Sequence, residues 1–189
     1  MQFVGFDKVK LVANKIEKDH PSIYFDFNAI AKGYGIDEIG RYLESQDCKN
    51  YLIELGGEIR ARGVNDIGEF WNVAIEDPNT DGTRSFSEVV RLENRAMASS
   101  GNYRKFKVDE KGKKFVHTIN AKTGYATESN LLAATVIANL DCADADGYAT
   151  AFMAMGFEKT KIFLEKHPEL KVYLIYVDDN GETHQEILN

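Results

Sequence analysis

Asp146 and Thr150 are the residues in this chain whose types and spacing point most directly to chemistry. They lie in a stretch rich in alanine, 141–156, that predicts a helix, and residues four apart share one helix face. A carboxylate and a hydroxyl together are hard oxygen donors, which suit magnesium or calcium better than zinc. The stretch is also typical of an acidic first turn, in which Asp141 and Asp144 cap the helix and complement its dipole. The spacing alone leaves both interpretations open.

A second candidate site begins at residues 22–27, which predict a strand leading directly into a helix. Asn28 can cap that helix, which is expected to continue to about Glu44, with Ile36 and Ile39 at helical spacing. The free N–H groups at such a helix start form a ready site for a phosphate. An ordinary junction between a strand and a helix explains the same pattern.

Three further features allow a functional and a structural interpretation. Gly56-Gly57 fits a tight turn between two strands, and it could also bring backbone amides close to a ligand. Residues 95–103 are small and polar where a strand would be bulky, which suits either a flat ligand or a tight turn. His117 ends a predicted strand, where a lone histidine is more often structural than catalytic.

Length, composition and charge exclude several classes of protein. The chain has 189 residues, which is typical of one domain, and its 43% hydrophobic content supports a real core. A net charge of −7 argues against a nucleic acid or an anionic membrane as a partner bound through bulk charge. Two cysteines, with Cys142 inside the predicted helix, argue against a disulfide framework. No run approaches the ~20 apolar residues of a membrane-spanning helix, and no signal peptide is visible.

The order of predicted elements indicates an α+β fold with antiparallel sheets and packed helices, because most links between strands are short. Residues 131–138 are almost continuously apolar and predict a central strand. The other predicted strands span 8–12, 22–27, 50–55, 58–63, 70–75, 86–92, 103–108, 114–119 and 172–177, followed by a last strand after an Asn180-Gly181 turn. A further helix is predicted over 158–167.

Four stretches, taken together and in order, resemble one family. They are 26–34, similar to the motif D-x-[SN]-[AG]-[IV]-[AG]-[KE]-G-Y; 56–58, similar to GG[DE]; 100–103 with 117–124, similar to SG-x-Y…H-x-[IV]-[DN]-P-x-TG; and 145–150, similar to A-D-[AG]-x-x-T. The chain thereby resembles the ApbE family, the FAD:protein FMN transferases, once called thiamine biosynthesis lipoproteins. The similarity covers nearly the whole chain, 1–189, which is expected to form one ApbE-like domain related to the T-fold.

The resemblance implies an enzyme that splits FAD with the help of Mg²⁺. Such an enzyme attaches FMN through a phosphoester to a Thr or Ser hydroxyl of an acceptor protein and releases AMP. Two alternatives stay open, a pyrophosphatase that hydrolyses FAD to FMN and AMP and a flavin-binding domain without catalysis. A hard divalent ion that bridges the pyrophosphate would neutralise the charge that develops during transfer.

The resemblance also assigns roles to residues. Asp146 and Thr150 would bind Mg²⁺ through side-chain oxygens and Ala29 through its backbone carbonyl, which leaves Asp141 and Asp144 as ordinary acidic residues of a first helical turn.

The remaining assignments concern FAD and the acceptor. Asp26 and Lys32 would lie against FAD, and Ile119 would flank the flavin nucleotide. His117 matches an important histidine of the family and is the candidate for handling the proton of the acceptor hydroxyl, since an unperturbed histidine pKa of about 6.5 suits proton transfer at neutral pH.

The chain departs from the family pattern in two places. Ala121 stands where the family has Pro, and Asn120 often has Asp as its counterpart, but neither change removes an expected ligand. Full-length members carry well over a hundred residues before the first motif, including a lipoprotein signal. The resemblance therefore predicts that this chain is the C-terminal portion of a longer pattern, and that the full-length form is exported and anchored to a membrane by a lipid.

Overall fold

The computed structural model describes residues 2–76, 86–101, 106–108, 114–116, 122, 124–125, 129–178 and 180–189. A short 3-10 helix, η1 (Phe6–Lys8), precedes the first hairpin. The strands are β1 (Val9–Val12), β2 (Lys15–Lys18), β3 (Tyr51–Leu55), β4 (Glu58–Arg62), β5 (Trp71–Glu76), β6 (Phe86–Leu92), β7 (Ala96–Gly101), β8 (Phe106–Val108), β9 (Lys114–Val116), β10 (Leu131–Ala138), β11 (Lys171–Val177) and β12 (Thr183–Leu188). The helices are α1 (Ala31–Ser45), α2 (Cys142–Met155) and α3 (Phe157–Leu164).

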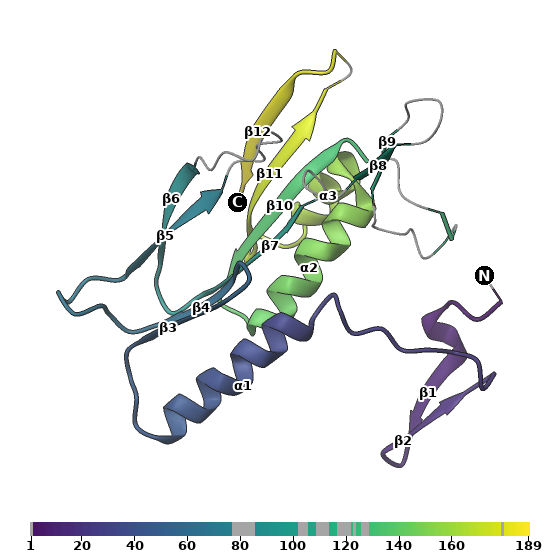
Figure 1. The fold of residues 1–189 in the computed structure, drawn as a ribbon, viewed down its shortest axis with the longest axis horizontal. Coiled ribbons are helices and arrows are strands. Elements are labelled where there is room, and N and C mark those ends of the chain that lie inside the picture. The colour runs from purple at the N-terminus through teal and green to yellow at the C-terminus, as the bar shows by residue number, and fades with distance from the viewer. Residues whose placement is uncertain are drawn as a thin grey trace.

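A six-stranded sheet in the order β12-β11-β10-β7-β4-β3 forms the centre of the structure. Every neighbouring pair in it is antiparallel, which confirms the predicted α+β class. The apolar strand 131–138 lies in the interior of the sheet as β10, as predicted. Figure 1 shows the β1–β2 hairpin standing apart from this sheet. Within the described ranges, no helix is both long and apolar enough to cross a membrane.

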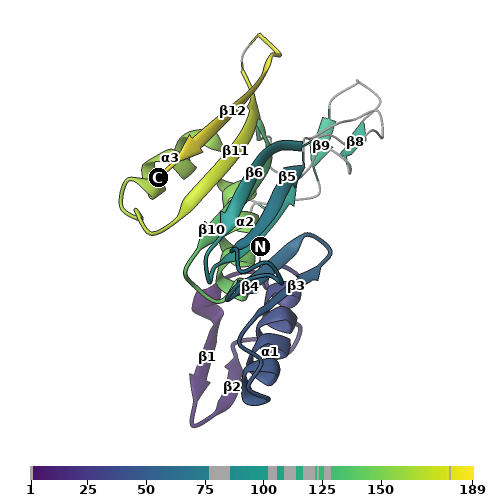
Figure 2. The ribbon, with the colours of Figure 1, turned by 90° about the vertical axis from the view of Figure 1, so that its left-hand side faces the viewer.

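The two faces of the sheet bury different partners. Alternating strand residues point to opposite faces, so Ala96 and Ala98 join a core beneath the helices while Met97 joins a second core beneath β5 and β6. Figure 2, viewed from the side of β5 and β6, shows these strands in front of the sheet and α2 behind it. The result is a three-layered arrangement of helices, sheet and a two-stranded ribbon.

The small residues of 95–103 have a packing role that neither sequence interpretation foresaw. Residues 96–101 form β7, and the buried Ala96 and Ala98 share a core with the buried Ala145 and Ala149 of α2. Because alanine side chains are short, the backbone of α2 can approach the sheet closely. This approach fixes the helix face that carries Asp146.

Two local predictions around residues 22–30 are wrong. Residues 23–27 have no regular secondary structure, and the strand that follows β1 is β2. Asn28 does not cap α1, which begins at Ala31 after Ile30. The Asp26 carboxylate instead accepts hydrogen bonds from the backbone and side-chain nitrogens of Asn28, at 2.8 and 3.3 Å. This local turn competes with the helix for Asn28, as Asx turns commonly do.

Helices α1 and α2 meet at their N-terminal ends through a glycine contact. Gly33 is buried, and a Cβ atom built on it would lie 2.4 Å from the carbonyl oxygen of Cys142 and 2.6 Å from the backbone nitrogen of Ala143. No side chain other than hydrogen fits at that distance. Close packing against α2 therefore explains the glycine at position 33, whereas a Cβ on Gly35 would meet nothing within 4 Å.

We expect Gly33→Ala and Gly35→Ala to have opposite effects on stability. Gly33→Ala pushes α1 away from α2 and should lower the free energy of unfolding by about 1–3 kcal/mol, the usual cost of overpacking. Gly35→Ala should raise it by about 0.5–1 kcal/mol, because alanine loses less backbone entropy in a helix. Urea unfolding of both variants checks this, and equal effects would contradict the proposed helix contact.

Candidate functional site

The site lies where α1, α2 and β4 meet, and a buried carboxylate organises it. Asp37 of α1 is fully buried and accepts hydrogen bonds from the backbone nitrogens of Cys142 and Ala143, both at 2.9 Å. These are the first two N–H groups of α2, so Asp37 caps a helix more than one hundred residues away in the sequence. Arg60 of β4 donates to Asp37 Oδ1 at 2.6 Å and balances its charge.

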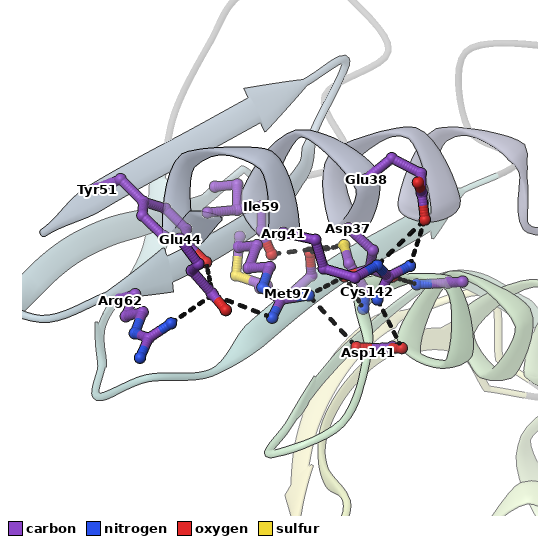
Figure 3. A network of polar contacts seen from close by, with 12 residues as sticks. Asp37, Glu38, Arg41, Glu44, Tyr51, Ile59, Arg62, Met97, Asp141 and Cys142 are labelled. Atoms are coloured by element: carbon purple, nitrogen blue, oxygen red, sulfur yellow. Dashed lines mark hydrogen bonds and ion pairs between the residues drawn. The ribbon is translucent and has the colours of Figure 1, made fainter. Parts of the chain in front are cut away.

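Asp141 does not cap α2 as one sequence interpretation expected. It precedes the helix, but its side chain makes no capping hydrogen bond. Its carboxylate pairs instead with Arg41 at 3.2 Å and with Arg60 at 3.3 Å. Figure 3 shows Arg41 and Asp141 near the start of α2.

A polar network extends from this junction to the edge of the sheet. Glu44 accepts a hydrogen bond from the Tyr51 hydroxyl and pairs with Arg62 at 2.7 Å (Figure 3). These partners hold the pKa of Glu44 below its usual value, with the Tyr51 hydrogen bond contributing most. A polar pocket of about 530 Å³ lies beside the network, but Arg60 and Arg62 on its wall are already paired with carboxylates. This pocket is separate from the residues expected to carry the chemistry.

Asp146 is the centre of the candidate site, and this residue is 3% exposed. Its Oδ2 accepts a hydrogen bond from the backbone nitrogen of Gly33 at 3.1 Å, which joins α2 to the first turn of α1. Burial raises the pKa of Asp146 above its usual value, while the Gly33 N–H and the Lys32 charge oppose that rise. Burying an ionised carboxylate with so few partners costs stability, which is typical of a binding site.

Thr150 lies one turn further along α2, and its hydroxyl is 3.3 Å from the hydroxyl of Ser100 on β7. Ser100 belongs to one of the motifs that resemble the family, but the sequence predicted no role for it. The structure places its hydroxyl beside Thr150, an expected ligand of the cation. The i, i+4 spacing puts Asp146 and Thr150 on one helix face, as the sequence predicted.

Ala29 belongs to the turn that precedes α1, and this turn packs beside α2. A Cβ on Gly147, the neighbour of Asp146, would lie 3.3 Å from the side chain of Ile30. Ala29 is outside the helix, and its carbonyl accepts none of the backbone hydrogen bonds seen between described residues. Among the described residues, the Ala29 carbonyl oxygen therefore has no backbone donor, and it belongs to a turn that packs beside α2.

Lys32 and Glu58 form an ion pair that the sequence did not foresee. Gly56 and Gly57 make the predicted turn with positive φ angles of 62° and 103°, and this turn leads into Glu58 at the start of β4. The Lys32 Nζ atom lies 2.5 Å from Glu58 Oε2. At this distance the two groups form an ion pair. Their geometry is not that of a hydrogen bond, and neither buried carboxylate oxygen of Glu58 accepts a hydrogen bond from a described residue.

Burial raises the pKa of Glu58, and the nearby Asp146 charge adds to that rise, whereas Lys32 opposes it. Cys142 lies close to the same charges, and burial first and then Asp37, Glu58 and Asp146 raise the pKa of its thiol to about 12. Both cysteines are free, as predicted, and Cys142 is a buried, unreactive packing residue.

The remaining predicted site residues are Asp26, His117 and Ile119. Asp26 is exposed and bonds to Asn28 within its own turn. His117 and Ile119 lie outside the described residues, and their roles stay predictions. Across the described part of the chain, no group of three or more His, Cys, Asp or Glu side chains is arranged to hold a metal ion.

No pattern in the sequence assigned a role to Asp37 or to Glu58. Asp37 lies on the buried face of α1 with Gly33, Ile36 and Gly40, so a charged residue at apolar spacing was the available signal. Ile39, which was expected on that face, is 47% exposed. Glu58 was visible only as the acidic end of the glycine turn.

The sequence of this chain is similar to those of known proteins. Residues 1–174 match the model of the ApbE family. A curated protein of Haemophilus influenzae named FAD:protein FMN transferase is 43% identical over 183 residues, which are 95% of this chain and 52% of that protein. A protein of the same name from Escherichia coli K12 is 35% identical over 160 residues, 85% of this chain and 44% of its own length. The chain spans about half the length of the curated relatives it matches.

A solved structure supports the same relation. The flavin transferase ApbE from Vibrio cholerae superposes with a TM-score of 0.85 at 34% sequence identity, covering 100% of this chain and 58% of that one. The superposition covers the whole chain, so the ApbE-like fold expected from the sequence motifs is confirmed.

We expect Glu58→Gln to gain stability relative to the wild type as the pH rises above 4.5, the ordinary Glu pKa. A raised pKa means that the folded state binds this proton more tightly than the unfolded state. Ionising Glu58 therefore destabilises the fold progressively between 4.5 and its raised pKa. Glutamine cannot ionise, so the difference in free energy of unfolding between variant and wild type should increase over that range.

Glu44→Gln is the matched control with the opposite sign. Because the pKa of Glu44 is lowered, its charge stabilises the fold above 4.5, and this contribution is lost as the pH falls through its lowered pKa. The difference in free energy of unfolding between Glu44→Gln and the wild type should change below pH 4.5 and stay constant above it. Urea unfolding of both variants across a pH series measures these differences. If the free energy of unfolding of Glu58→Gln relative to the wild type does not change above pH 4.5, the pKa of Glu58 is not raised.

Proposed function

Because the chain belongs to the ApbE family, we propose that it carries the chemistry of an Mg²⁺-dependent transferase that moves FMN from FAD to a protein. The acceptor is a Thr or Ser hydroxyl, and AMP is released. The observation that carries this proposal is the placement of Asp146 and Thr150 on one face of α2, beside Lys32 and the turn that contains Ala29. The names of the relatives support the choice of FAD and of a protein acceptor.

The described residues fit Mg²⁺ at this place. Asp146, Thr150 and Ala29 offer a carboxylate, a hydroxyl and a backbone carbonyl, which are the hard oxygen donors that Mg²⁺ prefers. Among the described residues, the two buried carboxylates Asp146 and Glu58 lie near one ammonium, that of Lys32, so these three groups carry an excess of negative charge. When bound, the ion would neutralise the charge that develops on the FAD pyrophosphate during transfer.

Lys32 and Asp26 would bind FAD on the side of α1. The Lys32 side chain is 45% exposed, so its ammonium can attract the pyrophosphate while its stem packs near the glycine turn. Asp26 shapes the turn that leads to Ala29 and presents a carboxylate to solvent. Ile119 would flank the flavin nucleotide.

His117 would take the proton of the acceptor hydroxyl. The hydroxyl oxygen then forms a bond to the FMN phosphorus while the bond from that phosphorus to the oxygen of the AMP phosphate breaks. The leaving AMP carries the negative charge that the broken bond releases. A histidine with a pKa near neutrality is suited to this transfer, which contributes typically 10²–10⁴-fold to a rate.

The remaining expectations rest on the family relation. We propose that residues 1–189 act as one ApbE-like domain and that the full-length protein is exported and held at a membrane by a lipid. Its partners are FAD and the acceptor protein, and the net charge of −7 argues against nucleic acid.

Incubation with FAD, Mg²⁺ and an acceptor protein, followed by mass spectrometry of the acceptor, tests the function. We expect the acceptor to gain the mass of FMN on a Thr or Ser residue. Asp146→Asn should slow this labelling on the order of a hundredfold, since it removes the charged cation ligand from the reacting centre. Asp144→Asn is the control, because Asp144 is exposed in the same helix and should not affect the rate.

The other outcomes distinguish the alternatives. Release of free FMN and AMP with an unlabelled acceptor would identify an FAD pyrophosphatase and overturn the transferase assignment. Binding of FAD without its consumption would identify a flavin-binding domain. Equal labelling by Asp146→Asn and the wild type would refute the cation ligand.

A further inference from the structure

Lys32, Glu58 and Asp146 form a small charge cluster built from three elements, α1, β4 and α2. The Glu58 side chain is 1% exposed and Asp146 is 3% exposed, whereas the Lys32 side chain is 45% exposed. The cluster carries two negative charges and one positive charge, so its net charge is −1 when all three groups are ionised. No second cation of the described residues is paired with either carboxylate.

We propose that the Lys32–Glu58 ion pair sets the affinity of the Asp146 site for a divalent cation, with Lys32 acting as an internal counter-ion that Glu58 holds in place. This inference rests on the proposed cation site at Asp146. Glu58 influences the cation through its charge and does not bind it.

The burial of Glu58 supports a role without direct contact. Both of its carboxylate oxygens have less than 1 Å² of accessible surface, and Lys32 Nζ already occupies the side of Oε2. A cation would need an open face on this carboxylate, and none is left.

The position of Lys32 explains how its charge can act on two carboxylates. Its ammonium contacts Glu58 directly, and Lys32 immediately precedes Gly33, whose backbone N–H donates to the Asp146 carboxylate at 3.1 Å. A flexible, partly exposed side chain can move toward an incoming anion without unfolding its surroundings. Glu58 thereby retains an ammonium at the place where a divalent cation and a pyrophosphate would meet.

Electrostatics predicts an order of affinities that a purely structural ion pair would not produce. Glu58→Gln changes the net charge of the cluster from −1 to 0 and should weaken Mg²⁺ binding. Lys32→Met changes it to −2 and should strengthen Mg²⁺ binding in the absence of FAD. The double variant returns the net charge to −1 and should bind Mg²⁺ as the wild type does.

Isothermal titration of the FAD-free protein with MgCl₂ tests this order. One charge at a distance of several ångströms should change the dissociation constant about tenfold in each single variant, and the double variant should lie within about twofold of the wild type. Glu44→Gln is the control, since it removes a carboxylate that pairs with Arg62 and should leave the constant unchanged. Circular dichroism checks folding, and Lys32→Met, at an exposed position, tests the inference even if Glu58→Gln folds poorly.

Three results would overturn the inference. If both single variants bind Mg²⁺ with the affinity of the wild type, the ion pair has a structural role alone. A double variant as weak as Glu58→Gln would make Glu58 a direct ligand. If the wild type binds no Mg²⁺, or Asp146→Asn binds it equally well, the proposed cation site fails and this inference fails with it. Binding that depends on Asp146 but ignores Lys32 and Glu58 refutes the inference alone.

Discussion

The contact between the N-terminal ends of α1 and α2 is the interaction on which the rest of the site depends. Gly33 lets the two backbones touch, and Asp37 accepts the first two N–H groups of α2. In return, Asp146 of α2 accepts the N–H of Gly33. A carboxylate near a helix N-terminus is favoured by the free N–H groups and by the helix dipole, so both helices stabilise a charge supplied by the other. The reciprocal bonds fix Asp146 beside Lys32.

The sheet and the small residues maintain this contact from below. Alanines on β7 and α2 bring the helix close to the sheet, and Arg60 on β4 pairs with Asp37 from the same side. Asp37 is compensated by three donors, whereas the described partners of the two buried site carboxylates are the Gly33 N–H for Asp146 and the Lys32 ammonium for Glu58. Among the described residues, the carboxylate that orients the helices therefore has more polar partners than either carboxylate of the candidate site. Such an imbalance lowers stability and is typical of functional sites, where a ligand completes the missing interactions.

Local patterns in the sequence predicted the parts of the structure that depend on neighbours in the chain. The four-residue spacing of Asp146 and Thr150 placed them on one helix face, and the apolar run 131–138 became the interior strand β10. The ordered motifs identified the family. The predicted strand 22–27 and the predicted Asn28 cap are wrong, and Asp26 instead accepts a hydrogen bond from Asn28 in a turn before the helix begins.

Long-range pairing explains what the sequence could not supply. Asp37 caps a helix that begins more than one hundred residues later, and its position on the buried face of α1 does not reveal that distant partner. Glu58 and Lys32 meet only because the glycine turn and α1 are packed on the same side of α2. Pairs of this kind are decided by tertiary packing, and one sequence without its fold does not contain their distances.

Crystals of the protein grown with Mn²⁺ in place of Mg²⁺ test the central claim most directly. An anomalous difference map locates the ion without reference to activity. We expect a peak at bonding distance from an Asp146 oxygen, with Thr150 and the Ala29 carbonyl among its ligands and Glu58 still paired with Lys32. A peak coordinated by Glu58, or no peak beside Asp146 at saturating Mn²⁺, would contradict it.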